Sequence, residues 1–413
     1  MSNAFSTGFS FGSPTSTESG TLLPTPSTSR ASSISQSSST NIPSGPLNLT
    51  SLSTTSWRQP YPSVGQFAMT DSEEVVAAGP NGLFYFTRVR DHDTTPWSES
   101  RPFPSVRVTL NNLTVSGLAL YSWRGSQQQS RLYLYCVSGG VLYSFYLTDK
   151  NNSSFVPDAS PPLAGYRVTG KPTVVQSRRN AYGSSDLWSL VVPCQSGGLL
   201  HTSATDSTGS YNKSVSTKWE AVDHLATDLG IISAVSVTAV HNPTGSGFST
   251  DDTTELVAAC ISRGQLNVVQ GSFHRDGYPG RWKWEGKTST RILHPGEVTG
   301  NPVLITDCGY HGKNQLDLLV PSAEGGIFHF VRTRSAPNDW HMIGRVAFPQ
   351  NIPPASCLSF HSRPEAYGKR ELYALVQTRG RLYHVKTTSS TLPWYNASLN
   401  PIVRPGPFFE FFE

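Results

Sequence analysis

Aromatic and cationic residues recur at fixed distances after six glycines of this 413-residue chain. The marker glycines are Gly82, Gly140, Gly198, Gly264, Gly326 and Gly380. Three positions after them stand Tyr85, Tyr143, His201, Asn267, His329 and Tyr383, and six positions after them stand Arg88, Tyr146, Ala204, Gln270, Arg332 and Lys386. A further ring follows each glycine, in order Trp97, Phe155, Trp219, Trp284, Trp340 and Trp394. A cation beside a ring suits sugar binding, because the ring covers the apolar C–H face while the cation donates charged hydrogen bonds to hydroxyls.

Each marker glycine belongs to a repeated phrase, an apolar run followed by a tight turn and a second apolar run. The phrases at 73–86 and 316–329 are examples. Short runs rich in β-branched and aromatic residues are typical of buried strands. Glycine supplies the positive φ that a tight hairpin turn needs. Each phrase therefore predicts two antiparallel strands.

Further strands flank each phrase. The segments 169–175 and 299–305, upstream, have nearly the same sequence, and the downstream ring marks a fourth strand. Four antiparallel strands repeated six times predict an all-β fold, a six-bladed β-propeller of four-stranded antiparallel blades. A solenoid is the rival architecture, but its repeats are usually about 20–45 residues long and often helical.

The N-terminal end of the repeats leaves the blade count open. Residues 57–64 match 97–106, so we expect them to form an outer strand that packs on the last blade and closes the ring. A partial seventh blade is the alternative, since the ring Trp394 already marks an outer strand there.

Composition bounds the organisation and the partners. Residues 1–56 are rich in Ser, Thr and Pro and predict a disordered tail, followed by the propeller at 57–404 and a C-terminal tail at 405–413. The net charge is +4, and no basic stripe suggests nucleic-acid binding. No apolar run reaches the roughly eighteen residues that a membrane span needs. No signal peptide is visible, which predicts a cytoplasmic or unconventionally secreted protein. The oligomeric state stays open.

The cysteines and the motif content predict no catalysis and no cofactor. Five cysteines with no CxxC pair argue against a disulfide framework and a zinc site. Three of them lie four residues before a marker glycine, where other units have Ala78, Ser322 and Val376, so this position is a small buried slot. No nucleophile elbow, phosphate loop or dinucleotide motif is present. We therefore expect a protein that is not an enzyme and binds no metal.

A structural explanation of the rings and cations competes with a ligand-binding one. Outer-strand rings can fill the gaps between neighbouring sheets, and cations can be ordinary surface charges. Positions three apart in a strand face opposite sides of the sheet, so the two series after the glycines share a face only if a bulge intervenes.

The repeating unit resembles the PLL-like lectin propellers and the fungal fucose-specific lectin family over about 57–404, with the fullest match at 298–348. The resemblance implies a multivalent, non-catalytic carbohydrate-binding lectin whose partners are glycans or glycoproteins, possessing sites that combine an Arg, a Glu and a ring from neighbouring blades. The implied ligand-binding residues are Arg88, Trp97 and Glu99 in the first unit, Arg332 and Trp340 in the fifth, Lys386 and Trp394 in the sixth, and Tyr85, His329 and Tyr383 beside them. Units three and four lack the cation, which predicts degenerate sites there.

Two other functions stay open at this point. One is a propeller scaffold for protein–protein interaction without sugar binding, in which the rings belong entirely to the core. The other is a glycoside-active propeller, which requires paired carboxylates about 5–10 Å apart in one cleft.

Overall fold

The computed structural model divides the chain into two units, Met1–Ile42 and Pro43–Glu413, and every described residue lies in the second unit. The structure describes residues 66–70, 72–79, 82–87, 101–102, 110, 114–124, 130–147, 155–158, 161–178, 187–205, 218–241, 254–274, 281–284, 290–294, 296–306, 315–333, 339–346, 354–364, 370–378, 381–386 and 398–401.

The described strands form six antiparallel sheets, numbered 1 to 6 in chain order. Sheet 1 contains β1 (Phe67–Met69), β2 (Glu74–Gly79), β3 (Gly82–Thr87) and β4 (Arg101–Pro102). Sheet 2 contains β5 (Val115–Arg124), β6 (Ser130–Ser138), β7 (Val141–Leu147) and β8 (Val156–Pro157). Sheet 3 contains β9 (Thr173–Arg178), β10 (Leu187–Pro193), β11 (Leu199–Thr205), β12 (Lys218–Trp219) and β13 (Asp223–Leu225).

Sheets 4 to 6 repeat this pattern. Sheet 4 contains β14 (Ala234–His241), β15 (Thr254–Ser262), β16 (Gln265–His274), β17 (Arg281–Trp284) and β18 (Thr290–Ile292). Sheet 5 contains β19 (Val303–Thr306), β20 (Gln315–Pro321), β21 (Ile327–Thr333) and β22 (Trp340–Val346). Sheet 6 contains β23 (Cys357–Pro364), β24 (Arg370–Thr378), β25 (Arg381–Lys386) and β26 (Ser398–Pro401). In sheets 3 and 4 two short pieces share the outer position, because β12 and β13 both pair with β11, and β17 and β18 both pair with β16.

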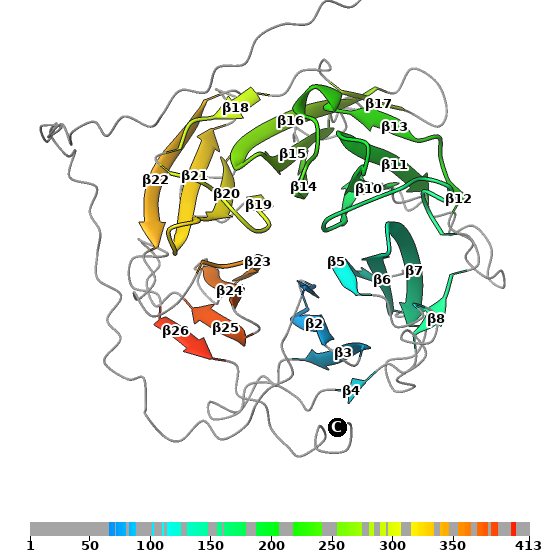
Figure 1. The fold of residues 1–413 in the computed structure, drawn as a ribbon, viewed down its shortest axis with the longest axis horizontal. Helices are drawn as coiled ribbons and strands as arrows, with labels where there is room; N and C mark the ends of the chain where they lie inside the picture. Colours follow the sequence, from blue (N-terminus) through cyan, green and yellow to red (C-terminus); the bar gives the residue numbers. More distant parts are fainter. Residues whose placement is uncertain are drawn as a thin grey trace, which may run out of the picture. The chain divides into compact units, whose positions relative to one another are not determined.

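The sheets stand around a common axis with their first strands innermost (Figure 1). The inner strands contact one another in the order β1, β5, β9, β14, β19, β23, and β23 contacts β1 again. This is the arrangement of a β-propeller, so the prediction of an all-β propeller of antiparallel sheets is confirmed. The described residues contain one short 3₁₀ turn, η1 (Thr227–Leu229). In this part of the chain there is no helix long and apolar enough to cross a membrane.

The predicted hairpin turns are confirmed at four marker glycines. Gly140, Gly198, Gly264 and Gly326 have φ values of +77°, +72°, +70° and +85°. A side chain would strain the backbone in this region of φ, which explains why glycine recurs there.

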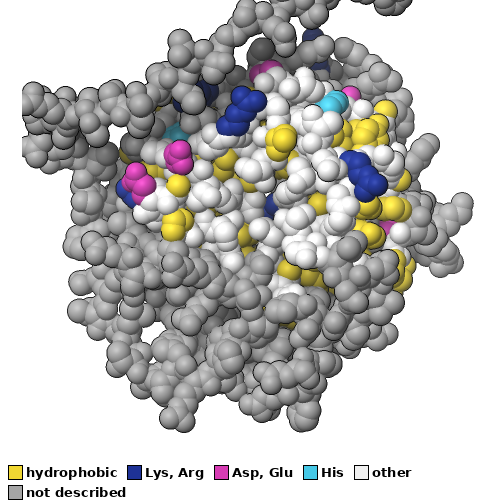
Figure 2. All heavy atoms as spheres, in the orientation of Figure 1, with side chains coloured by type: hydrophobic (Ala, Val, Ile, Leu, Met, Phe, Trp, Pro, Cys, Tyr) yellow, Lys and Arg dark blue, Asp and Glu magenta, His cyan; other side chains and the backbone are white. Residues whose placement is uncertain are grey.

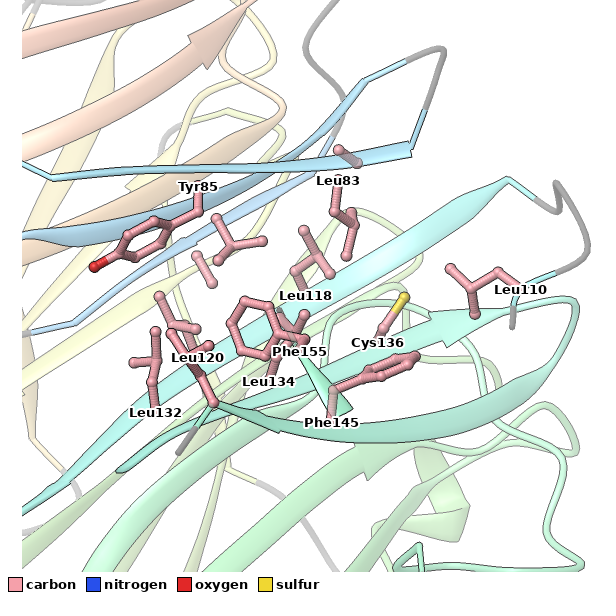
Figure 3. Close-up of a cluster of buried hydrophobic side chains, with 14 residues drawn as sticks. Leu83, Tyr85, Leu110, Leu118, Leu120, Leu132, Leu134, Cys136, Phe145 and Phe155 are labelled. Carbon is pink, nitrogen blue, oxygen red and sulfur yellow. The ribbon is translucent and has the colours of Figure 1, made fainter. Parts of the chain in front are cut away.

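Middle strands such as β10 and β15 are apolar on both sides because each sheet packs against two neighbours. On β15, Val257 and Ala259 belong to the cluster shared with sheet 5, whereas Leu256 and Ala258 belong to the cluster shared with sheet 3. Figure 3 shows the equivalent cluster between sheets 1 and 2. This two-sided burial turns the usual polar–apolar alternation of strands into continuous apolar runs.

The small buried slot is also confirmed. Cys136, Cys194 and Cys260 are free and buried, each in a different interface between sheets. Burial raises the pKa of the Cys136 and Cys260 thiols to about 12, so both thiols are neutral near pH 7. Cys308 lies outside the described residues.

Several predictions concern parts of the chain that the structure does not describe. The tails at 1–56 and 405–413, and the strand expected at 57–64, lie outside the described residues. The fourth strand of sheet 6 is β26, which pairs with β25. The domain boundaries and the partial seventh blade therefore stay predictions.

Candidate functional site

Arg332 and Glu255 form a two-point ion pair between sheets 5 and 4. Arg332 lies near the end of β21 and Glu255 near the start of β15. Nη1 of the guanidinium is 3.1 Å from Oε1 of the carboxylate, and Nη2 is 3.2 Å from Oε2. The arginine side chain is 1% exposed and the glutamate side chain 23%. Two parallel charged hydrogen bonds fix the carboxylate in one orientation.

Trp340 completes this group. The Arg332 guanidinium carbon lies 5.7 Å from the centroid of the Trp340 ring, within the range of a cation–π contact. The half-buried ring packs against the apolar cluster between sheets 4 and 5. Its buried Nε1 has no hydrogen-bond partner among the described residues. An arginine, a glutamate and a tryptophan from two neighbouring sheets thus come together.

The spacing after the marker glycine predicts Arg332 and Trp340 as site residues but not Glu255. That spacing relates residues of one unit, whereas Glu255 belongs to the preceding unit. The interpretation of Arg332 as an ordinary surface charge is wrong, because its side chain is enclosed between two sheets. The repeat contains one signal for this glutamate. Gln270 is the sixth residue after its marker glycine and pairs with Val257, and Glu255 lies two positions before Val257.

His329 does not join this group. Its Nε2 is 2.7 Å from Oδ1 of Asp317, and both side chains are buried. The neighbouring residues Phe328 and Phe330 face sheet 4, so His329 lies on the opposite face of β21 from Arg332. The register of β21 with β22 does shift between His329 and Phe330, but the additional residue, Ile343, is on β22. The bulge therefore does not bring the two predicted site residues together.

Tyr85 lies in the packing between sheets 1 and 2. It is 7% exposed, and its hydroxyl donates to Oε1 of Glu74 at 3.2 Å. Figure 3 shows this hydroxyl pointing away from the apolar side chains. His201 and His329 likewise bond polar side chains of the preceding strand, Ser189 and Asp317. In these three sheets the third residue after the glycine thus forms a buried polar pair.

His201 also brings a serine and an aspartate together. Its Nε2 lies 3.3 Å from Oγ of Ser189, and its Nδ1 lies 3.5 Å from Oδ2 of Asp223. The indole N–H of Trp284 also contacts Nδ1, at 3.4 Å. Ser189 is fully buried and His201 is 1% exposed, so this polar group is enclosed in the packing between the sheets.

The outer rings that the structure describes fill gaps between sheets. Trp219 of sheet 3 packs edge-on against Tyr135 of sheet 2, with 6.1 Å between centroids. Trp284 of sheet 4 packs against His201 of sheet 3 at 5.2 Å. Phe155 is 1% exposed in the cluster between sheets 1 and 2. The packing interpretation holds for these rings, and Trp340 has both apolar packing and the Arg332 contact.

The remaining predicted site residues are not placed. Arg88, Trp97, Glu99 and Trp394 lie outside the described residues. Lys386 and Tyr383 lie on β25, but the positions of their side chains are not described. Within the described ranges, no group of three or more His, Cys, Asp and Glu side chains could hold a metal ion. On the face seen in Figure 2, the lysine and arginine side chains of the described residues are spread rather than gathered in one patch.

Comparison with known proteins supports the fold. No family model matches the sequence, and no curated protein matches it. Among solved structures, AofleA from Arthrobotrys oligospora superimposes with a TM-score of 0.51 at 12% identity, covering 83% of this chain and 88% of that one. The fold is shared. At this identity the likeness shows the fold alone.

Two further matches are weaker. The BP39L lectin from Burkholderia pseudomallei has a TM-score of 0.44 at 12% identity, with coverages of 82% and 100%. The SapL1 lectin, solved in complex with alpha methyl fucoside, has a TM-score of 0.46 at 11% identity, with coverages of 84% and 99%. Both TM-scores are lower than that of AofleA and too low to show a shared fold by themselves.

Proposed function

We propose that this chain is a non-catalytic, multivalent carbohydrate-binding protein of the lectin type, with sites in the gaps between neighbouring blades of a six-bladed propeller. The observation that carries the proposal is the group of Arg332, Glu255 and Trp340 between sheets 4 and 5. It combines a charged donor, a charged acceptor and a ring, the three elements that sugar recognition uses.

Each member has a separate role in this proposal. The partly exposed carboxylate of Glu255 accepts hydrogen bonds from sugar hydroxyls, since a carboxylate has about four lone-pair positions and Arg332 occupies only two of them. Arg332 holds this carboxylate in one orientation through its two hydrogen bonds. The half-buried ring of Trp340 supplies apolar surface for the C–H face of a sugar.

A second site of this type is proposed between sheets 6 and 1. Two glutamates have the same position relative to the sixth residue after a marker glycine. In sheet 4 that residue is Gln270, which pairs with Val257, and Glu255 lies two positions before Val257. In sheet 6 it is Lys386, which pairs with Tyr373, and Glu371 lies two positions before Tyr373. Glu371 therefore has the register position of Glu255. Arg88 follows its marker glycine by the same six positions as Arg332, and sheet 1 follows sheet 6 around the ring. We propose Glu371, rather than Glu99, as the partner of Arg88.

Three further predicted residues stay part of the proposal. Trp97 is the ring of the site containing Arg88, and Lys386 with Trp394 forms a third site. Several weak sites around one ring give useful avidity for a glycan surface. A fucose-type sugar is proposed only because the repeating unit resembles the fucose-specific lectins in sequence.

The alternative is a scaffold that binds protein partners without sugar. It is favoured by one observation, which is that Trp219, Trp284 and Phe155 are packed between sheets. Under this alternative the ion pair of Arg332 with Glu255 only joins two blades.

Glycan-array binding of the full chain tests the proposal. Glu255→Asp keeps the charge opposite Arg332 but withdraws the carboxylate by one methylene, and we expect glycan binding to fall about tenfold, the effect of losing roughly 1.4 kcal/mol. Glu297→Asp is the matched control, because Glu297 is exposed on the segment that connects sheets 4 and 5. Equal binding by both variants would contradict the site, and no binding by the parent protein would favour the scaffold.

A further inference from the structure

Closure of the ring depends on the packing of the first sheet against the last. Sheet 1 takes its four strands from 67–102 and sheet 6 from 357–401. Among the described residues no strand of one pairs with a strand of the other. β1 and β23 contact each other at the axis, where Phe67 and Cys357 belong to one buried cluster.

Lys171 reaches this closure from the other side of the ring. It precedes β9 of sheet 3, and its Nζ donates to the backbone carbonyl of Leu358 at 3.3 Å. The same ammonium lies 3.9 Å from Sγ of Cys357 and 5.9 Å from the centroid of the Phe67 ring. One side chain thus contacts both β23 and β1.

Asn301 makes a second connection of the same kind. It precedes β19 of sheet 5 and has the position of Lys171 in the related segment 299–305. Its Nδ2 donates to Oε1 of Gln66 at 3.0 Å and lies 3.3 Å from Sγ of Cys357. The thiol of Cys357 in turn donates to the carbonyl of Phe67 at 3.7 Å.

The glycine before each of these residues permits the approach to the axis. A Cβ on Gly170 would lie 2.7 Å from the carbonyl oxygen of Ser233, and one on Gly300 would lie 2.8 Å from that of Ser356. Both glycines have positive φ, +63° and +62°. Only glycine tolerates this combination of crowding and backbone conformation, and it brings the following side chain to the centre.

We infer that the ring is held closed by a latch across its axis, in which Lys171 and Asn301 bind Cys357 and Leu358 of the last sheet together with Gln66 and Phe67 of the first. Among the described residues no strand is exchanged between sheets 1 and 6, and the hydrogen bonds of the latch connect the two sheets there. Cys357 is its centre, because its sulfur contacts the Lys171 ammonium, the Asn301 amide and the carbonyls of Phe67 and Leu358. Separating sheets 1 and 6 exposes the thiol, so its reactivity measures opening.

The rate of Cys357 alkylation in the full chain tests the latch. N-ethylmaleimide is added under native conditions, and peptide mass spectrometry follows Cys357 and the buried Cys260 in the same molecule. We expect Lys171→Met and Asn301→Ala each to raise the Cys357 rate about tenfold, corresponding to the loss of about 1.4 kcal/mol, with Cys260 unchanged. Hydrogen exchange in β1 and β23 should rise with it, and exchange in β15 should not.

Two control variants match these substitutions. Lys283→Met removes an exposed lysine of β17, and Asn267→Ala removes a buried asparagine whose Nδ2 bonds the carbonyl of Gln265. Lys171→Arg keeps the charge and should label Cys357 more slowly than Lys171→Met. The latch is wrong if Cys357 labels no faster than in the controls, if Cys260 accelerates equally, or if the Lys171→Arg and Lys171→Met rates agree.

Discussion

Arg332 and Glu255 are 77 positions apart in the chain, yet their side chains meet in a two-point ion pair between two blades. The guanidinium is almost fully enclosed, while the carboxylate keeps part of its surface toward solvent. A buried cation that holds a partly exposed anion is suited to orient that anion for a ligand. The same pair also joins sheets 4 and 5, so its effects on stability and on binding must be separated.

Removal of the cation alone should destabilise the protein. We expect Arg332→Ala to lower the free energy of unfolding by about 2–3 kcal/mol, less than for a fully buried pair, because Glu255 is partly solvated. Replacing both partners, Arg332→Met with Glu255→Leu, should recover much of the loss, since no charge then stays buried. Urea unfolding measures both, with Arg291→Ala, an exposed arginine on β18, as a control expected within about 0.5 kcal/mol of the parent. A double variant as unstable as Arg332→Ala would contradict this view of the pair.

The proposed second pair predicts coupling between Arg88 and Glu371. If both act in one site, Arg88→Ala, Glu371→Gln and the double variant should lose similar amounts of glycan binding, because the second change removes nothing further. Glu99→Gln should bind as the parent does. Two results would contradict the pair and favour Glu99 as the partner of Arg88. One is a double variant whose loss of binding is the product of the two single losses. The other is a larger loss in Glu99→Gln than in Glu371→Gln.

Two histidine–aspartate pairs of sheet 5 differ in burial and should differ in their contribution to stability. His329 and Asp317 are 2.7 Å apart and buried, whereas His341 and Asp339 are 2.9 Å apart with side chains 62% and 59% exposed. Asp317→Ala leaves a buried imidazole without this partner and should cost about 1–3 kcal/mol. Asp339→Ala should change stability by less than about 1 kcal/mol. Thermal and urea unfolding compare them directly, and equal effects would mean that His329 finds another partner.

The buried thiols predict a loss of stability at alkaline pH. Burial raises the pKa of Cys260 from 9.0 to about 12, with a smaller contribution from the charge of Asp228. The folded protein therefore holds the thiol proton more tightly than the unfolded chain does. The stabilisation is complete below pH 9 and is lost as the pH rises from 9 toward 12.

Cys260→Ala removes the contribution of this thiol, so the free energy of unfolding should fall less steeply above pH 9. Ala is tolerated in the slot, since Ala78 occupies it in sheet 1. Urea unfolding at pH 8, 9, 10 and 11 measures the slope, and native alkylation at pH 8 should leave Cys260 unlabelled. Parallel declines in the parent and the variant would show that Cys260 does not ionise on unfolding in this range.

Local chemistry explains how much of this fold could be read from the sequence. The period of the apolar runs and the turn glycines predicted strands, hairpins and antiparallel sheets, because strand geometry and positive φ depend on neighbours in the chain. The slot of Cys136, Cys194 and Cys260 was predicted for the same reason, since a repeated small residue marks a repeated packing constraint.

Only the tertiary structure decided which units share a site. His329 and Arg332 are three positions apart, and the sequence predicted one shared face only if a bulge intervened. The structure has the bulge on β22 and not on β21, so the two residues lie on opposite faces. Glu255 has no local relation to Arg332, and Lys171 and Cys357 have none to each other. These pairs form because closing a ring brings the face of one sheet against the next. Only after the structure had shown one such contact could the repeat be used to infer an equivalent pair, Arg88 with Glu371.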